Sequence, residues 1–67
     1  MTNIELLNEY IEKNGYKLQY IADQLFITRW ALYQKLNNKS SFKQGEIKKL
    51  CELLNISPQE CIKIFLS

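Results

Sequence analysis

Apolar residues along this chain recur at intervals of three and four, the spacing that places side chains on one face of a helix. Five such stretches follow one another, and no segment alternates apolar and polar residues for long enough to predict a strand. The pattern therefore predicts an all-α fold, a compact five-helix domain over residues 1–67. The three middle helices are expected at residues 18–25, 29–36 and 44–54.

Capping residues place the two outer helices. Thr2 and Glu5 have the spacing of a capping box, in which the Thr2 hydroxyl accepts a hydrogen bond from the Glu5 amide. The first helix is expected to end at Gly15, which supplies a left-handed stop. Residues 57–60 combine a second capping box with a proline at the first helical position, so the last helix is expected to begin there.

Apolar stripes on four of the helices are expected to build the core. They comprise Ile4, Leu7 and Ile11; Leu18, Ile21, Ala22 and Leu25; Ile47, Leu50, Cys51 and Leu54; and Cys61, Ile62 and Phe65. The start of the helix at 44–54 has two candidate forms, because either Ser41 caps it or the chain stays extended past Phe42.

Composition narrows the possible chemistry. The chain is 46% hydrophobic and 24% charged, as globular proteins are, but it holds no histidine and a single aspartate. We therefore expect no enzymatic activity, no metal site and no cofactor. Cys51 and Cys61 are expected to be reduced core residues. Because no apolar run approaches the roughly 20 residues of a membrane span, and no signal-like segment opens the chain, we expect a cytoplasmic protein without a membrane partner.

Charge is distributed unevenly along the chain, although the net charge is only +2. No acidic residue stands between Gln24 and Gly45, and this segment carries several bases, whereas the first twelve residues carry only acidic charges. The bases of the segment are Arg29, Lys35, Lys39 and Lys43. An anionic partner is expected at this positive middle of the chain, and the alternative is an ordinary solvated basic face.

The expected helix at 29–36 has an exposed face suited to reading DNA. If Leu32 and Leu36 define its buried direction, then Trp30 and Gln34 point away from the core, with Tyr33 on the flank. Arg29 falls nearer the buried side, but its long side chain reaches past the end of the helix. Arginine pairs with guanine and glutamine with adenine, and the aromatic rings suit thymine methyl groups or phosphates.

Residues 18–32, LQYIADQLFITRWAL, resemble the helix-turn-helix of phage Cro/repressor-type (XRE-like) transcription regulators. The similarity continues through residues 35–39, Phe42 and residues 46–57, and so covers nearly the whole chain in the five-helix order of that family. The resemblance implies a lambda-repressor-like fold. It also implies that the helix at 29–37 enters the major groove while the preceding helix braces it across the DNA backbone.

Carried over by position, the resemblance assigns two sets of DNA contacts. Base contacts fall on Arg29, Trp30, Tyr33 and Gln34, and backbone contacts on Lys17, Gln19, Thr28, Asn37, Asn38 and Lys39. The chain departs from the family pattern at three places. Phe26 replaces the usual glycine of the turn, Leu18 stands where the family often has glutamine, and Lys35 stands at an apolar position whose core role is expected to pass to Leu36.

These observations predict a sequence-specific regulator that binds double-stranded DNA, such as a phage or prophage-type repressor or a Cro-like switch protein. The alternative is a protein-interaction module on the same fold, an anti-repressor or partner-docking domain, in which Trp30 and Tyr33 form an interface hot spot.

The last helix predicts assembly. Ile64 and Leu66 fall outside its expected core stripe, so we expect them at the interface of a two-fold symmetric homodimer. The alternatives are that they fold back over a groove of the same chain, or that the dimer forms only on DNA. Such a dimer can place two recognition helices about 34–36 Å apart, one turn of DNA, and the operator is then a near-palindrome.

Overall fold

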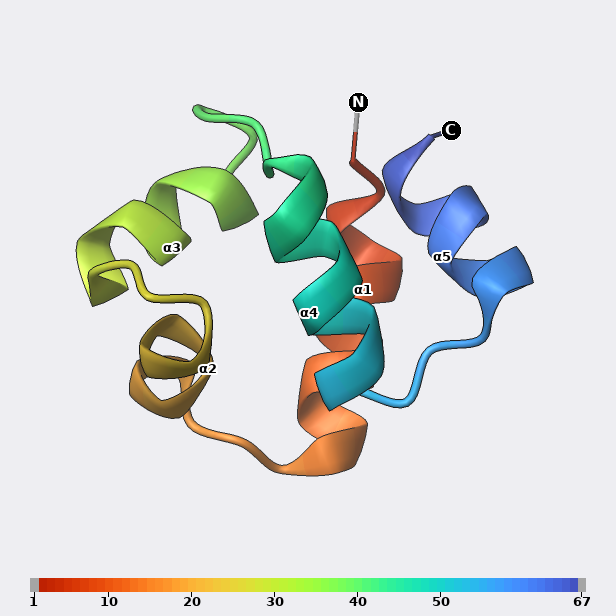
Figure 1. Ribbon diagram of the computed structural model, residues 1–67, viewed down its shortest axis with the longest axis horizontal. Helices are drawn as coiled ribbons and strands as arrows, with labels where there is room; N and C mark the ends of the chain where they lie inside the picture. The colour runs from red at the N-terminus through yellow and green to blue at the C-terminus, as the bar shows by residue number, and fades with distance from the viewer. Residues whose placement is uncertain (1, 67) are drawn as a thin grey trace.

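The computed structural model describes residues 2–66 and contains five α-helices in this range, with no strand (Figure 1). The helices are α1 (Ile4–Asn14), α2 (Leu18–Gln24), α3 (Arg29–Leu36), α4 (Gln44–Leu53) and α5 (Pro58–Phe65). The predicted all-α, five-helix fold is confirmed. Over the described residues, none of the helices has the length and apolar content needed to cross a membrane.

One helix start differs from the capping prediction, and another shows which of two expected forms is adopted. Asn3, and not Thr2, caps α1, because its side chain accepts a hydrogen bond from the Leu6 amide at 3.2 Å. The Asn3 amide itself donates to the Ile64 carbonyl at 2.6 Å. This bond holds Asn3 in place beside α5, and the cap of α1 therefore lies one residue later than expected. At α4 the chain stays extended past Phe42, and the Lys43 amide donates to the Glu46 carboxylate at 2.8 Å.

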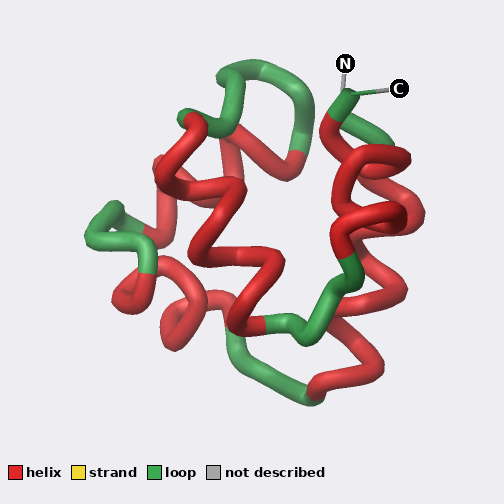
Figure 2. The backbone as a smooth tube through the Cα atoms, turned by 45° about the vertical axis from the view of Figure 1, so that its right-hand side comes forward, coloured by secondary structure: helices red, strands yellow, loops and turns green. Residues whose placement is uncertain are grey.

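One buried cluster forms the core, and all five helices contribute to it. Its fully buried large side chains are Leu7, Ile21, Leu32, Leu50, Leu54 and Ile64. α4 runs through the middle of the bundle, between the α2–α3 pair and the α1–α5 pair (Figures 1 and 2). The Asn14 side chain links α1 to the end of α4, because its amide donates both to the Tyr10 carbonyl at 2.8 Å and to the Leu54 carbonyl at 3.1 Å.

The structure corrects the face that α5 turns to the core. Ile64 is 0% exposed, so its assignment to a dimer interface is wrong, whereas Ile62 is 58% exposed although it was expected in the core stripe. The inward face of α5 carries Cys61, Ile64 and Phe65, which are spaced three and four apart and so lie on one side of the helix. Leu66, just beyond α5, is 75% exposed and remains available for contact.

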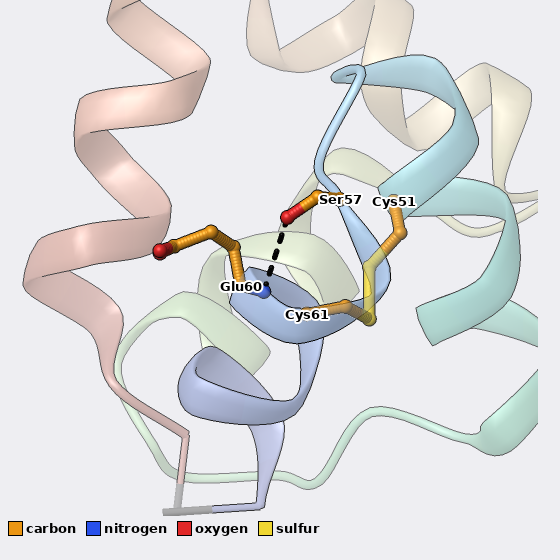
Figure 3. Close-up of a disulfide and its surroundings, with 4 residues drawn as sticks. All are labelled: Cys51, Ser57, Glu60 and Cys61. Carbon is orange, nitrogen blue, oxygen red and sulfur yellow. Dashed lines mark hydrogen bonds between the residues drawn. A yellow bond between two sulfur atoms is a disulfide. The ribbon is translucent and has the colours of Figure 1, made fainter.

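A disulfide joins Cys51 of α4 to Cys61 of α5, so the expectation of two reduced thiols is wrong (Figure 3). Both cysteines lie on the facing sides of consecutive helices, and the turn between the helices is short. The Ser57 hydroxyl accepts a hydrogen bond from the Glu60 amide at 3.2 Å and starts α5 as predicted. This tight start brings the two Cα atoms to 6.3 Å, within the range of a disulfide.

Candidate nucleic-acid interface

α2 and α3 are joined by a turn that two backbone hydrogen bonds close at the end of α2. The Ile27 amide donates to the Ala22 carbonyl at 3.0 Å, and the Phe26 amide donates to the Asp23 carbonyl at 3.2 Å. This pair of bonds is the Schellman motif, which closes a helix by placing one residue in the left-handed conformation. The turn therefore fixes the direction of α3 relative to α2.

Phe26 is that left-handed residue, with φ of 58°, at the position where the resembled family has glycine. The other left-handed residues among those described, Gly15, Asn38 and Asn55, are of the types that tolerate this conformation best. A phenylalanine here costs backbone energy, and its ring is 94% exposed, so it recovers no burial in return. Phe26 is the costliest residue of the turn, and nothing in the packing of the domain explains it.

Thr28 starts α3 as predicted. Its hydroxyl accepts a hydrogen bond from the Ala31 amide at 3.0 Å, and its own backbone is extended. The cap satisfies one of the free amides in the first turn of α3 and fixes the start of the helix, of which Arg29 is the first residue.

The two faces of α3 differ in composition. Leu32 is completely buried and Lys35 is 7% exposed, whereas Leu36 is only half-buried. The buried direction therefore passes between Leu32 and Lys35. Leu36 packs against the core as expected, but it does not replace Lys35, which is itself buried.

This rotation of the buried direction frees the predicted reading face. Arg29, Trp30 and Tyr33 are all exposed and Gln34 is half-buried, and together they span an arc of about 140° around the helix. Arg29, which was expected nearer the buried side, lies on this open face. The structure thus places all four predicted base-contact residues on one side of α3.

Lys35 is held by an internal polar network. Its ammonium lies 3.4 Å from a Glu46 carboxylate oxygen and donates to the Ser41 carbonyl at 2.9 Å. It also lies 6.0 Å from the centre of the Phe42 ring, a distance at which a cation interacts with an aromatic face. Lys35 is one of the bases of the positive segment, but its charge is buried and paired with the Glu46 carboxylate. The exposed bases of that segment are Arg29, Lys39 and Lys43.

The residues after α3 form a second hydrogen-bonded turn. The Asn38 amide donates to the Lys35 carbonyl at 3.2 Å, and the Lys39 amide donates to the Gln34 carbonyl at 3.0 Å. The Asn37 side chain donates back to the Tyr33 carbonyl at 2.7 Å. All three predicted backbone-contact residues of this turn are exposed, and they continue directly from the end of the α3 face.

Lys17 and Gln19, the remaining predicted backbone contacts, lie at the start of α2. Both are exposed, and the Lys17 backbone is extended as the residue before a helix requires. The Gln19 side-chain amide donates to the Asp23 carboxylate at 2.9 Å. A phosphate at this position therefore meets an amide that already has an acidic partner.

Sequence reasoning missed the buried lysine, although a signal for it was present. Glu46 is the first carboxylate after the acid-free segment, and it stands in the first turn of a helix. A base at an otherwise apolar position and an isolated carboxylate nearby in the chain are the two halves of a buried ion pair.

Comparison with known proteins gives a family. Residues 3–67 match the family described as "Protein of unknown function (DUF739)". The chain belongs to the DUF739 family. No curated protein and no solved structure matches it. The description of DUF739 names no activity, so the chemistry of the α3 face is what bears on function.

Proposed function

We propose that this DUF739 protein is a sequence-specific regulator that binds double-stranded DNA. In this proposal α2 and α3 act as a helix-turn-helix, with α3 in the major groove and α2 across the backbone. The similarity to phage Cro/repressor-type regulators favours a phage or prophage-type repressor or a Cro-like switch protein.

The exposed face of α3 is the observation that carries the proposal. It presents a guanidinium, an amide and two aromatic rings, from Arg29, Gln34, Trp30 and Tyr33, on one side of a helix held at both ends. Trp30 is 71% exposed, and an exposed tryptophan is costly without a partner. Arginine and glutamine are the residue types that read guanine and adenine from the major groove.

The electrostatics support an anionic partner for the same face. Arg29 and Lys39 lie at the start of α3 and just past its end, and neither forms an ion pair within residues 2–66. No acidic residue lies in α3 or in the turn that follows it. A phosphate backbone running along α3 thus meets positive charge at both ends of the helix and no carboxylate between them.

Selection of bound duplexes from a random pool, followed by sequencing, tests the proposal most directly. We expect one enriched motif, and binding of that motif that weakens steeply as salt rises, because phosphate contacts release counterions. The Lys48→Gln variant, which changes an exposed lysine of α4 outside the proposed contacts, should bind the enriched motif as the wild type does. Binding to every duplex with equal, salt-insensitive and weak affinity contradicts DNA reading.

A homodimer completes the proposal. Ile62 and Leu66 are exposed beside a groove of about 440 Å³ between α4 and α5, whose apolar lining includes Phe42, Ile47 and Phe65. One surface thus carries both projecting and recessed apolar groups, as the self-complementary contact of a two-fold dimer requires. α5 and α3 lie at opposite ends of the long axis (Figure 1), so contact through α5 leaves both α3 faces open for a near-palindromic operator.

The exposed aromatics also favour a second candidate, a module that binds a protein through the same face. Trp30 and Tyr33, at 71% and 56% exposure, suit an interface hot spot. The two functions differ in the role of Arg29. If the protein reads DNA, loss of the Arg29 side chain relaxes the preference at one base position. If the face binds a protein, neither the wild type nor an Arg29 variant gives a footprint on any duplex.

A further inference from the structure

The turn between α2 and α3 borders a second surface that the proposed DNA contacts do not use. Phe26 lies beside a groove of about 390 Å³, whose lining also includes Leu25, Lys43, Gly45, Glu46 and Lys49. We propose that this groove binds an acidic segment of a partner protein, with an apolar side chain of the segment placed against Phe26. The inference does not depend on DNA binding, because no base-contact residue of α3 lines the groove.

The apolar part of the groove is exposed to solvent, and no side chain among residues 2–66 fills it. Phe26 is 94% exposed in a left-handed conformation that suits glycine far better, so the chain keeps an aromatic ring in water at a backbone cost. Gly45 leaves open space on the α4 side, since a Cβ atom placed there would meet no other atom within 4 Å. An exposed aromatic beside an open apolar recess is typical of an anchor site for one side chain of a partner.

The charges around the groove select an acidic partner. Lys43 and Lys49 are exposed, and neither forms an ion pair in the part of the chain that the structure describes. Glu46 is the acidic member of the lining, but its carboxylate is committed to Lys35 and to the Lys43 amide. The groove therefore presents two free positive charges around an apolar site, and carboxylates of a partner are their complement.

The apolar lining favours a protein segment over a nucleic acid. A DNA backbone has phosphates for Lys43 and Lys49 but no large apolar side chain that could fill the recess beside Phe26. An acidic, amphipathic segment supplies both kinds of contact, since it sets an apolar side chain in the groove and places its carboxylates at the rim.

An NMR titration of the full chain tests this inference. The probe is a peptide of about a dozen residues with two leucines one helical turn apart and glutamates at its other exposed positions. We expect amide shifts confined to the turn after α2 and to the first two turns of α4, with a dissociation constant on the order of 100 µM or tighter. A matched peptide with glutamine at every glutamate position separates charge from apolar contact, and it should bind at least about fivefold more weakly.

Variants of the chain complete the test. Phe26→Gly removes the ring and suits the left-handed backbone, so it should weaken peptide binding about tenfold or more while the protein stays fully folded. Lys43→Gln and Lys49→Gln should each weaken binding about threefold, and Lys48→Gln, an exposed lysine outside the lining, should not.

Several outcomes overturn the inference. Absence of shifts at millimolar peptide, or equal binding by Phe26→Gly, removes the anchor site. Equal binding of the glutamine peptide removes the charge selection. Shifts at the same amides that follow the concentration of the protein, or that arise with duplex DNA alone, assign the groove to a second copy or to nucleic acid.

Discussion

The ammonium of Lys35 lies 3.4 Å from the Glu46 carboxylate, and only 8% and 12% of the two side chains are exposed. This pair joins α3 to the first turn of α4 and, through the Ser41 carbonyl, fixes the end of the loop between them. On the buried side of α3, this ion pair and Leu32 together set the orientation of the helix and thus of its open face. Such a pair is sensitive to the loss of one partner, because the remaining charge stays shielded from water.

Glu46→Gln is expected to lower the free energy of unfolding by about 3 kcal/mol, since it leaves the Lys35 charge without its partner. Urea unfolding followed by circular dichroism measures the loss. Glu60→Gln is the control, because the Lys63–Glu60 pair is 69% and 33% exposed and is worth at most about 1 kcal/mol. Equal losses in the two variants contradict a special role for the Lys35–Glu46 pair. The double variant Lys35→Met with Glu46→Gln should recover part of the loss.

The helices and most of the core could be predicted because their signals are local. Periodic apolar positions fixed the five elements, and the caps at Thr28 and Ser57 stand where expected. The rotation of a helix about its own axis is not local, since it depends on what the neighbouring helix offers. On α3 the carboxylate of Glu46 allows Lys35 to face inward, which turns Leu36 partly outward.

The same limit explains the error at the C-terminal helix. Ile62 and Ile64 are equally apolar, so the sequence alone does not show which of them joins Cys61 and Phe65 on the inward face. The contact with α4 decides it, because the disulfide to Cys51 fixes one edge of α5, and the bond from the Asn3 amide to the Ile64 carbonyl fixes its end beside α1. The resulting rotation exposes Ile62.

Phe26→Gly is expected to raise the free energy of unfolding by about 1 kcal/mol. The substitution relieves a left-handed phenylalanine, and because the ring is 94% exposed it gives up little burial. Asn55→Gly is the matched control at another left-handed position, and it should change stability less, since asparagine tolerates this conformation. A destabilised Phe26→Gly variant in urea unfolding means that the ring contributes packing energy to the fold.

The disulfide is expected to stabilise the domain. The two cysteines are ten residues apart, and closing a loop of this length stabilises a protein by about 2–3 kcal/mol through the entropy of the unfolded chain. Thermal unfolding with and without a reductant measures this difference, and thiol titration of the native protein counts the free cysteines. Cys61→Ser should unfold at the temperature of the reduced protein. Two titratable thiols in protein purified without reductant contradict the pairing.

Substitutions on α3 should separate base contacts from phosphate contacts. Arg29→Ala and Gln34→Ala are each expected to weaken binding to the selected duplex by about 1–3 kcal/mol and to relax the preference at one base position. Lys39→Ala should instead weaken binding to all duplexes alike and lower the salt slope by about one unit. Fluorescence anisotropy with selected and scrambled duplexes measures both effects. If Arg29→Ala loses the same affinity on every sequence, Arg29 contacts phosphate.

Assembly through α5 gives the last prediction. Ile62 and Leu66 are the exposed apolar residues beside the α4–α5 groove, whereas Ile64 is sealed in the core. The double variant Ile62→Asp with Leu66→Asp should therefore be monomeric and retain its helical circular dichroism. By contrast, Ile64→Asp should unfold the chain, because it buries a carboxylate without a partner.

Sedimentation equilibrium of the wild type and the double variant decides between a dimer and a monomer. We expect the wild type to dimerise at or below about 100 µM, since an interface that also supplies missing apolar burial stabilises so small a domain. A wild type that stays monomeric at that concentration, or a double variant that dimerises as well as the wild type does, removes α5 from the interface. If dimers form only when a selected duplex is present, the near-palindrome supplies the second copy and the protein contact alone is too weak to hold it.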